Sequence, residues 1–194
     1  MNLYFTFFSF NKFIKFFCFF NNVVVAARYA LHHHGLNRVA IVDFDVHHGN
    51  GTEHIVAGDQ RIMMCSSFQH PFYPHSGSPV LASNILSVPI DAGATGEVFR
   101  NKVAHWFAAL THFKPELILL SAGFDAHAED PMAHLRLTED DYYWLSVELK
   151  KVADTCCEGR IVSALEGGYD MSALGRSVVA HLKGLAYQVA KPAL

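Results

Sequence analysis

Aspartate and histidine alternate at the end of one short apolar run, and these residue types are suited to metal chemistry. The segment reads Asp43-Phe-Asp45-Val-His47 and continues His48-Gly-Asn-Gly. In an extended chain alternate side chains share a face, so Asp43, Asp45 and His47 are expected to point the same way. Carboxylate oxygens and imidazole nitrogens suit Zn²⁺, and three protein ligands leave a position for water. A polar turn without a metal is the alternative, and it is disfavoured because strands are poor in unsatisfied Asp.

Two other apolar runs are also followed by residues that could take part in binding or catalysis. The run at 116–121 leads to a third carboxylate, Asp125, and the run at 160–165 leads to Gly167-Gly168-Tyr169. Paired glycines let a backbone approach a substrate closely, and a Tyr hydroxyl can donate to a developing oxyanion. A Gly-Gly-Tyr sequence by itself usually marks a turn. Together with the two carboxylate segments, it is a stronger signal of a functional site.

The elements that must position these residues alternate between strand and helix. Apolar periodicity predicts helices over 23–34, 96–113, 138–158 and 172–190, and strands over 38–44, 61–66, 84–90, 116–121 and 160–165. Strands alternating with helices predict an α/β fold with a mainly parallel sheet. Active sites of such folds collect at the carboxyl ends of the strands, where the three segments lie.

Composition narrows the possible functions. The 194 residues are 51% hydrophobic and carry a formal charge of −3, so a basic stripe for direct nucleic-acid binding is not expected. The four cysteines form no CxxC pair, which is typical of reduced thiols. A cytoplasmic protein is expected, with the nucleus possible in a eukaryote.

The three segments, in this order, resemble the zinc-dependent histone deacetylase family. They are Asp-x-Asp-x-His-His-Gly-Asn-Gly, Ser-Ala-Gly-Phe-Asp-Ala-His and Glu-Gly-Gly-Tyr. Asn50 and the run Cys-Ser-Ser-Phe-Gln-His-Pro-Phe-Tyr-Pro at 65–74 are similar to the family's class II and bacterial amidohydrolase branch. The resemblance covers about 17–185 and implies a three-layer arginase/deacetylase-like fold.

The resemblance also implies roles for individual residues. It makes Asp45, His47 and Asp125 the zinc ligands, and Tyr169 the catalytic residue that holds the acetyl oxygen and stabilises the tetrahedral intermediate. A structural monovalent cation, usually K⁺, would be held by Asp43 and by backbone oxygens near Asp45, His47 and Ser66. The substrate tunnel would be lined by Phe17, Tyr73, Met132, Gly167 and Gly168. The implied reaction is metal-assisted hydrolysis of the acetyl amide on a lysine side chain.

The N-terminus departs from the family pattern. The family's general base is a tandem His pair upstream of a Gly-Phe-Cys segment, whereas residues 1–15 contain no histidine. We therefore expect a Phe-rich segment over 1–16, and a partial catalytic domain over 17–194 that lacks the N-terminal strands. The triple histidine at 32–34 is interpreted as a helix C-terminus and not as a replacement base. Lys12 and Lys15 interrupt the apolar run, so a signal peptide or membrane anchor is disfavoured.

Several readings of function stay open from the sequence. The leading one is an acetyl-lysine deacetylase, weak or inactive because the base is missing. A second is deacetylation of acetylpolyamines or small acylamides, although Met132 stands where polyamine enzymes often have an acidic residue. An arginase-like binuclear manganese site would need more ligands than these motifs offer. The non-enzyme reading is a metal-binding remnant or interaction module.

Overall fold

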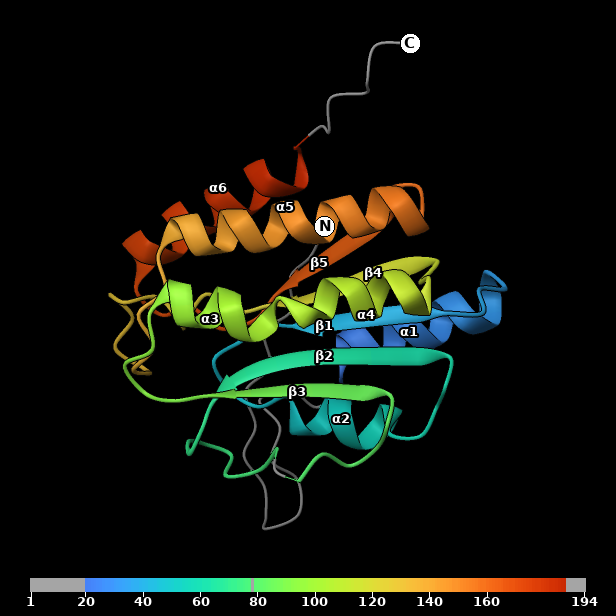
Figure 1. Cartoon of the computed structure of the whole chain (residues 1–194), viewed down its shortest axis with the longest axis horizontal. Helices are drawn as coiled ribbons and strands as arrows, with labels where there is room; N and C mark the ends of the chain where they lie inside the picture. Colours follow the sequence, from blue (N-terminus) through green and yellow to red (C-terminus); the bar gives the residue numbers. More distant parts are fainter. Residues whose placement is uncertain (1–19, 78, 188–194) are drawn as a thin grey trace.

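A parallel sheet of five strands forms the centre of the molecule in the computed structural model, which describes residues 20–77 and 79–187. The strands lie in the order β3-β2-β1-β4-β5 (Figure 1). Their bounds are β1 (Val39–Asp43), β2 (Ile62–Gln69), β3 (Ile85–Ile90), β4 (Leu117–Ala122) and β5 (Ile161–Leu165). Each pair of neighbours is parallel, which confirms the predicted sheet.

Helices cover both faces of this sheet and make three layers (Figure 1). One face is covered by α1 (Asn22–His33) and α2 (Asn50–Val56). The other is covered by α3 (Gly96–Val103), α4 (His105–Phe113), α5 (Glu139–Cys156) and α6 (Met171–Leu185). Strands that are covered on both sides need apolar residues at successive positions, because each face must be buried.

The central strand shows this pattern fully. All five residues of β1 are buried. Val39 and Ile41 pack toward α1 and α2, whereas Ala40 and Val42 pack toward the four-helix layer. The alternation places the end of β1, and the segment that follows it, between two packed layers.

Local sequence signals set the helix ends. The Asn21 side chain accepts a hydrogen bond from Val24 N at 2.9 Å and begins α1. Asp141 accepts one from Thr138 N at 2.8 Å, which is half of a capping box at the start of α5. Gly35 follows α1 with φ 66°, a conformation that favours glycine, so the end predicted there is confirmed.

Some predicted boundaries differ from the structure. The helix predicted over 96–113 is divided into α3 and α4 at Ala104. Helix α2 was not predicted, because its start, Asn50-Gly51, is typical of a turn. Strand β2 extends to Gln69, and α6 ends at Leu185. The boundary predicted between residues 16 and 17 lies outside the described residues.

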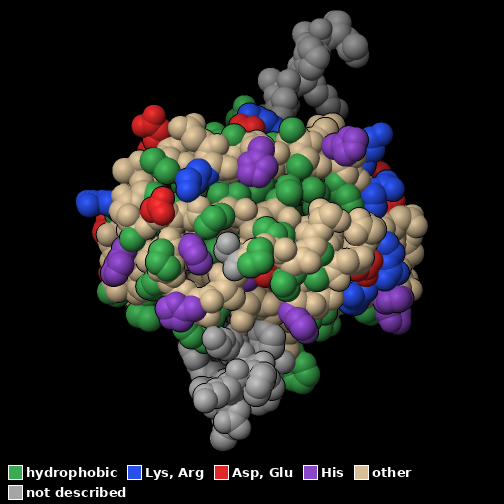
Figure 2. Space-filling view, turned by 60° about the horizontal axis from the view of Figure 1, so that its bottom comes forward, with side chains coloured by type: hydrophobic (Ala, Val, Ile, Leu, Met, Phe, Trp, Pro, Cys, Tyr) green, Lys and Arg blue, Asp and Glu red, His purple; other side chains and the backbone are tan. Residues whose placement is uncertain are grey.

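The surface carries no continuous basic stripe on the face drawn in Figure 2. Lys and Arg side chains lie near its periphery with Asp and Glu among them. This agrees with the formal charge of −3. Within residues 20–77 and 79–187, no helix is both long enough and apolar enough to cross a bilayer.

Candidate metal centre

Two carboxylates and one imidazole converge at the carboxyl edge of the sheet. Asp45, His47 and Asp125 each offer a ligand atom, and these atoms lie within 4.8 Å of one another. His47 Nδ1 lies 3.0 Å from Asp45 Oδ1 and 3.1 Å from Asp125 Oδ2. The Asp125 side chain is fully buried, and its Oδ2 faces His47. The structure therefore brings together the three residues that were predicted to hold a metal.

Strand topology accounts for the convergence. β1 and β4 are neighbours in the sheet, with Asp43 opposite Ser121. The segments that leave these two strands carry Asp45 and His47 on one side and Asp125 on the other. The expected extended geometry holds only as far as Asp43, where β1 ends, and His47 lies in a bend. The direction of the His47 side chain is therefore set by the loop conformation and not by the alternation of a strand.

Backbone N–H groups fix the orientation of both carboxylates. Asp45 Oδ1 accepts from His47 N at 2.8 Å, and Asp45 Oδ2 accepts from Gly167 N at 2.8 Å. Asp125 Oδ1 accepts from Val46 N at 2.9 Å, which leaves Oδ2 directed at His47. Charge-assisted bonds of this kind favour the ionised carboxylate, and they hold both oxygens of Asp45 and one oxygen of Asp125 in place.

Two glycines allow the backbone to approach these carboxylates. A Cβ built on Gly123 would lie 2.3 Å from Asp45 Oδ2, and one on Gly167 would lie 2.1 Å from Asp125 Oδ2. Both distances are shorter than a real carbon can accept, so any side chain would displace a ligand. Gly167, predicted as a tunnel residue, thus lies directly against the metal cluster.

The electrostatics of the cluster favour a bound cation. Burial and the charge of Asp45 raise the pKa of Asp125 to about 7. Burial and the charge of Asp45 also raise the pKa of Asp43 well above its usual range. Burial lowers the pKa of His47, but hydrogen bonds to Asp125 and Asp45 outweigh it and raise this pKa to about 10. A buried group of carboxylates that attracts a proton this strongly is suited to a divalent ion, and the donor set fits Zn²⁺.

A second polar cluster lies beneath the first. The Asp43 carboxylate is buried, and its Oδ1 accepts from Asp45 N at 3.2 Å. Ser66 is opposite Asp43 in the β1–β2 register, and its buried hydroxyl has no hydrogen-bond partner among the described atoms. A Cβ on Gly49 would lie 2.2 Å from Asp43 Oδ2. The resemblance implied a structural monovalent cation at Asp43, Asp45, His47 and Ser66, and this site stays a prediction.

Aromatic rings stand over the histidine of the cluster. The His47 ring stacks on Phe72 with centroids 5.5 Å apart and meets Tyr73 edge-on at 6.3 Å. Tyr73 is 41% exposed and Met132 is 49% exposed. Both side chains are therefore accessible to solvent, and their role in a substrate tunnel stays a prediction. Phe17, the other predicted wall residue, lies outside the described residues.

The loop that carries the predicted catalytic tyrosine is held by one buried carboxylate. Asp130 Oδ2 accepts from Tyr169 N at 2.6 Å and from Asp170 N at 3.1 Å, while its Oδ1 accepts from Met132 N at 2.9 Å. Asp130 therefore joins the Tyr169 loop to the Met132 loop. Gly168 in this loop has φ 139°, which only glycine adopts readily.

Three residues near the centre were not predicted from the sequence. They are Gly123, Phe72 and Asp130. The glycine after a buried strand was a usable signal, because isolated glycines there often mark close approach. Asp130 and Phe72 carried no such signal, since their contacts join segments far apart in the sequence.

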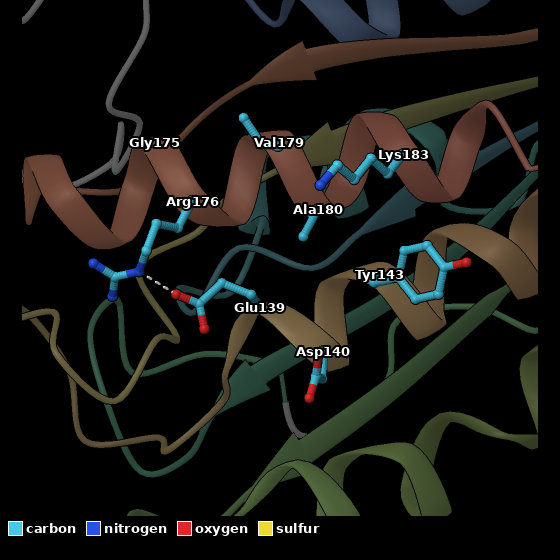
Figure 3. Close-up of a pocket in the computed structure, with 8 residues that line it drawn as sticks. All are labelled: Glu139, Asp140, Tyr143, Gly175, Arg176, Val179, Ala180 and Lys183. Carbon is cyan, nitrogen blue, oxygen red and sulfur yellow. Dashed lines mark hydrogen bonds and ion pairs between the residues drawn. The ribbon is translucent and has the colours of Figure 1, made fainter.

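A separate groove lies between α5 and α6 (Figure 3). It has a volume of about 560 Å³, and its α5 side carries Glu139 and Tyr143. Arg176 on α6 donates to Glu139 across it. No predicted site residue lines this groove.

Sequence comparison identifies similar proteins. The histone deacetylase domain matches residues 13–185. The chain is 44% identical to histone deacetylase 10, chloroplastic, of Oryza sativa, over 84% of this chain and 38% of that protein. It is 40% identical to type-2 histone deacetylase 2 of Dictyostelium discoideum, over 87% of this chain and 11% of that protein. A protein of Synechocystis, slr0245, is 42% identical over 88% of this chain and 56% of its own length.

Solved structures show the same fold. The HD domain of HDA15 matches with a TM-score of 0.79 and 32% identity, over 87% of this chain and 50% of that one. The histone deacetylase Clr3 matches with a TM-score of 0.77 and 30% identity, over 86% of this chain and 30% of that one. These matches confirm the arginase/deacetylase-like α/β fold. The chain spans about half or less of the length of these relatives, and it belongs to the histone deacetylase family.

Proposed function

We propose that this chain binds one zinc ion at Asp45, His47 and Asp125 and hydrolyses the acetyl amide of acylated lysine side chains. The observation that carries the proposal is the convergence of two carboxylates and an imidazole within 4.8 Å, beneath an aromatic wall. Membership of the histone deacetylase family makes the chain a deacetylase by descent, and relatives from two archaea are named probable deacetylases.

Different residues of the chain have different roles in the proposed reaction. Zinc, when bound, supplies a Lewis acid that polarises the acetyl carbonyl and acidifies a water molecule. Asp45 and Asp125 would supply the negative charge that retains the ion, and backbone hydrogen bonds to both Asp45 oxygens and to Asp125 Oδ1 fix the orientation of these carboxylates. The Tyr169 hydroxyl donates to the oxyanion, and Asp130 holds the backbone of that tyrosine. Phe72 and Tyr73 limit access of water to His47.

A structural potassium ion at Asp43 and Ser66 belongs to the same proposal. The partnerless Ser66 hydroxyl and the buried Asp43 carboxylate are oxygen donors that such an ion would satisfy. It would also offset the negative charge behind Asp45.

We propose that the 194 residues by themselves have low activity, because residues 1–16 of this sequence contain no histidine that could act as the general base. General-base assistance commonly contributes about 10²–10⁴-fold to rate. Met132 at the rim is apolar and exposed, which favours an acyl-lysine stem over a cationic acetylpolyamine. The cytoplasmic location stays a prediction, and a fluorescent fusion would distinguish it from the plastid in which two relatives are named.

The test measures zinc content and turnover on the same purified 194-residue chain. We expect one zinc per chain and slow hydrolysis of an acetyl-lysine peptide in preference to acetylspermidine. Asp125→Asn should lose the zinc, whereas Asp91→Asn, at a side chain 89% exposed, should keep it. Absence of stoichiometric zinc in the intact chain would contradict the proposal. Full zinc without any turnover would favour the metal-binding module instead.

A further inference from the structure

His48 follows the proposed ligand His47 directly, but it is not part of the metal cluster. Its Nδ1 lies 2.8 Å from Ser76 Oγ, and its Nε2 lies 3.0 Å from Glu53 Oε2. The side chains of His48 and Glu53 are 1% and 3% exposed, so both polar groups are removed from water. Polar groups are buried at little cost only where they satisfy one another. The roles given to the metal cluster do not use this second imidazole.

The three polar groups complement one another chemically. An ionised carboxylate only accepts hydrogen bonds, so the short distance to Glu53 favours a ring that carries its proton on Nε2. The Ser76 hydroxyl can then donate to Nδ1. Loss of this hydroxyl would leave a nitrogen of a buried ring without its partner, which destabilises the contact.

The three groups belong to three different segments of the chain. Glu53 lies in α2, His48 lies in the segment that leaves β1, and Ser76 lies in the connection between β2 and β3. Glu53 Oε1 also accepts from Leu81 N at 3.5 Å, so α2 contacts the connection at a second point. Through these contacts the β2–β3 connection is attached to the segment that carries His47.

The backbone of the connection also packs against the His48 ring. A Cβ on Gly77 would lie 3.0 Å from His48 Cδ2 and 2.4 Å from Phe68 Cζ, so no side chain fits there. Gly77 has φ 97°, which favours glycine. The rings of Phe68 and His48 have centroids 4.5 Å apart. The imidazole therefore contacts both β2 and the connection, and its position restricts where the connection can lie.

The same connection carries the aromatic rings that stand over His47. Phe72 and Tyr73 have ring centroids 5.5 Å and 6.3 Å from that of His47. His75 N donates to Phe72 O at 2.7 Å, and this turn ends directly before Ser76. Two adjacent imidazoles thus contact the connection, the first at the aromatic pair and the second at the serine that follows the turn.

We propose that His48 is a positioning residue, which through Ser76 and Glu53 holds the aromatic pair Phe72 and Tyr73 over the metal cluster. The part that concerns substrate rests on the proposed function, because the two rings are there assigned to the wall around the acyl-lysine stem. The order of the connection itself depends neither on zinc nor on turnover. The alternative is that His48 contributes to stability alone and leaves the aromatic pair unaffected.

The test compares the intact 194-residue chain with Ser76→Ala, with Ser76→Thr and with the control Ser83→Ala. The threonine variant keeps the hydroxyl, and Ser83 is an exposed serine of the same connection. Amide hydrogen exchange is measured at His75, whose N–H is bonded to Phe72 O. We expect Ser76→Ala to accelerate this exchange about fivefold, which corresponds to one lost hydrogen bond. The other two variants should exchange as the parent chain does.

Zinc content and hydrolysis of an acetyl-lysine peptide are measured on the same samples. We expect Ser76→Ala to keep its zinc and its kcat, while KM rises by about the same factor as the exchange rate. A displaced wall weakens substrate binding but leaves the metal and Tyr169 in place, and such a loss appears in KM alone. Ser76→Thr should restore the KM of the parent chain.

Two results would overturn the proposal. One is unchanged exchange at His75 in Ser76→Ala, which would show that the connection is held without this contact. The other is faster exchange with an unchanged KM, which would leave His48 a purely structural role. Absence of turnover in the parent chain would contradict the proposed function and the part that concerns substrate, whereas exchange at His75 would still decide whether the connection is held. If Ser76→Ala does not fold, the similarly sized Ser76→Cys replaces it, because a thiol is a weaker donor.

Discussion

His181 should make the stability of the fold depend on acidity, through a contact directly behind the metal centre. Its ring lies 5.8 Å from Phe44 and 5.7 Å from Phe124, the residues that precede Asp45 and Asp125. His181 is 3% exposed, and burial lowers its pKa from 6.5 to about 4. The native state therefore resists a proton that the unfolded chain accepts.

The hydrogen bonds of the ring define its neutral form. Ser146 Oγ donates to Tyr142 O at 2.6 Å, so it accepts from His181 Nδ1–H at 2.7 Å. Ser163 Oγ then donates to His181 Nε2 at 3.0 Å. Protonation of Nε2 would require the Ser163 hydroxyl to turn and accept, and it would place a charge among aromatic rings.

The size and sign of the effect follow from the pKa values. Above pH 6.5 the histidine is neutral in both states and contributes no pH dependence. Between pH 6.5 and about 4 the unfolded state binds the proton and the native state does not. The free energy of unfolding therefore decreases as the pH is lowered through this range. At 1.36 kcal/mol per pKa unit, the loss reaches about 3 kcal/mol. For a chain of this length that lowers Tm by about 6–12 °C.

The assay compares thermal unfolding of the parent chain and two variants from pH 7 to pH 4. His181→Gln should remove most of this pH dependence, because glutamine does not titrate. His112→Gln, at an exposed position, should leave the slope as in the parent. If the parent and His181→Gln curves stay parallel over the whole range, the buried neutral histidine is not the source and the reasoning is refuted.

Further predictions concern the metal centre. Gly167→Ala places a Cβ 2.1 Å from Asp125 Oδ2, so zinc affinity in a chelator competition should fall by about tenfold or more, whereas Gly175→Ala, with open space around its Cβ, should not change it. Asp130→Asn removes an acceptor from the Tyr169 N–H and should cost about 1–3 kcal/mol in denaturant unfolding, with zinc content unchanged. Tyr169→Phe should lower any measurable deacetylation about 10²–10³-fold at equal zinc content, and an unchanged rate would contradict its oxyanion role.

The sequence by itself determined the architecture and the residue types of the site. Continuous β-branched and apolar runs predicted buried parallel strands, because both faces of such strands must be covered. Polar residues after those runs predicted the carboxyl edge as the site. This pattern made Asp43, Asp45, His47 and Asp125 candidate metal ligands, and the resemblance to the family selected Asp45, His47 and Asp125. The structure brings these three residues together.

Only the tertiary structure decided the features that depend on contacts between distant segments. Asp130 joins the Tyr169 and Met132 loops. Phe72 stacks on His47. Gly167 lies so close to Asp125 that no room remains for a Cβ atom. Sequence periodicity describes one element at a time and carries no information on loop conformation. The face of the sheet on which α1 lies was likewise decided by the packing of the layers.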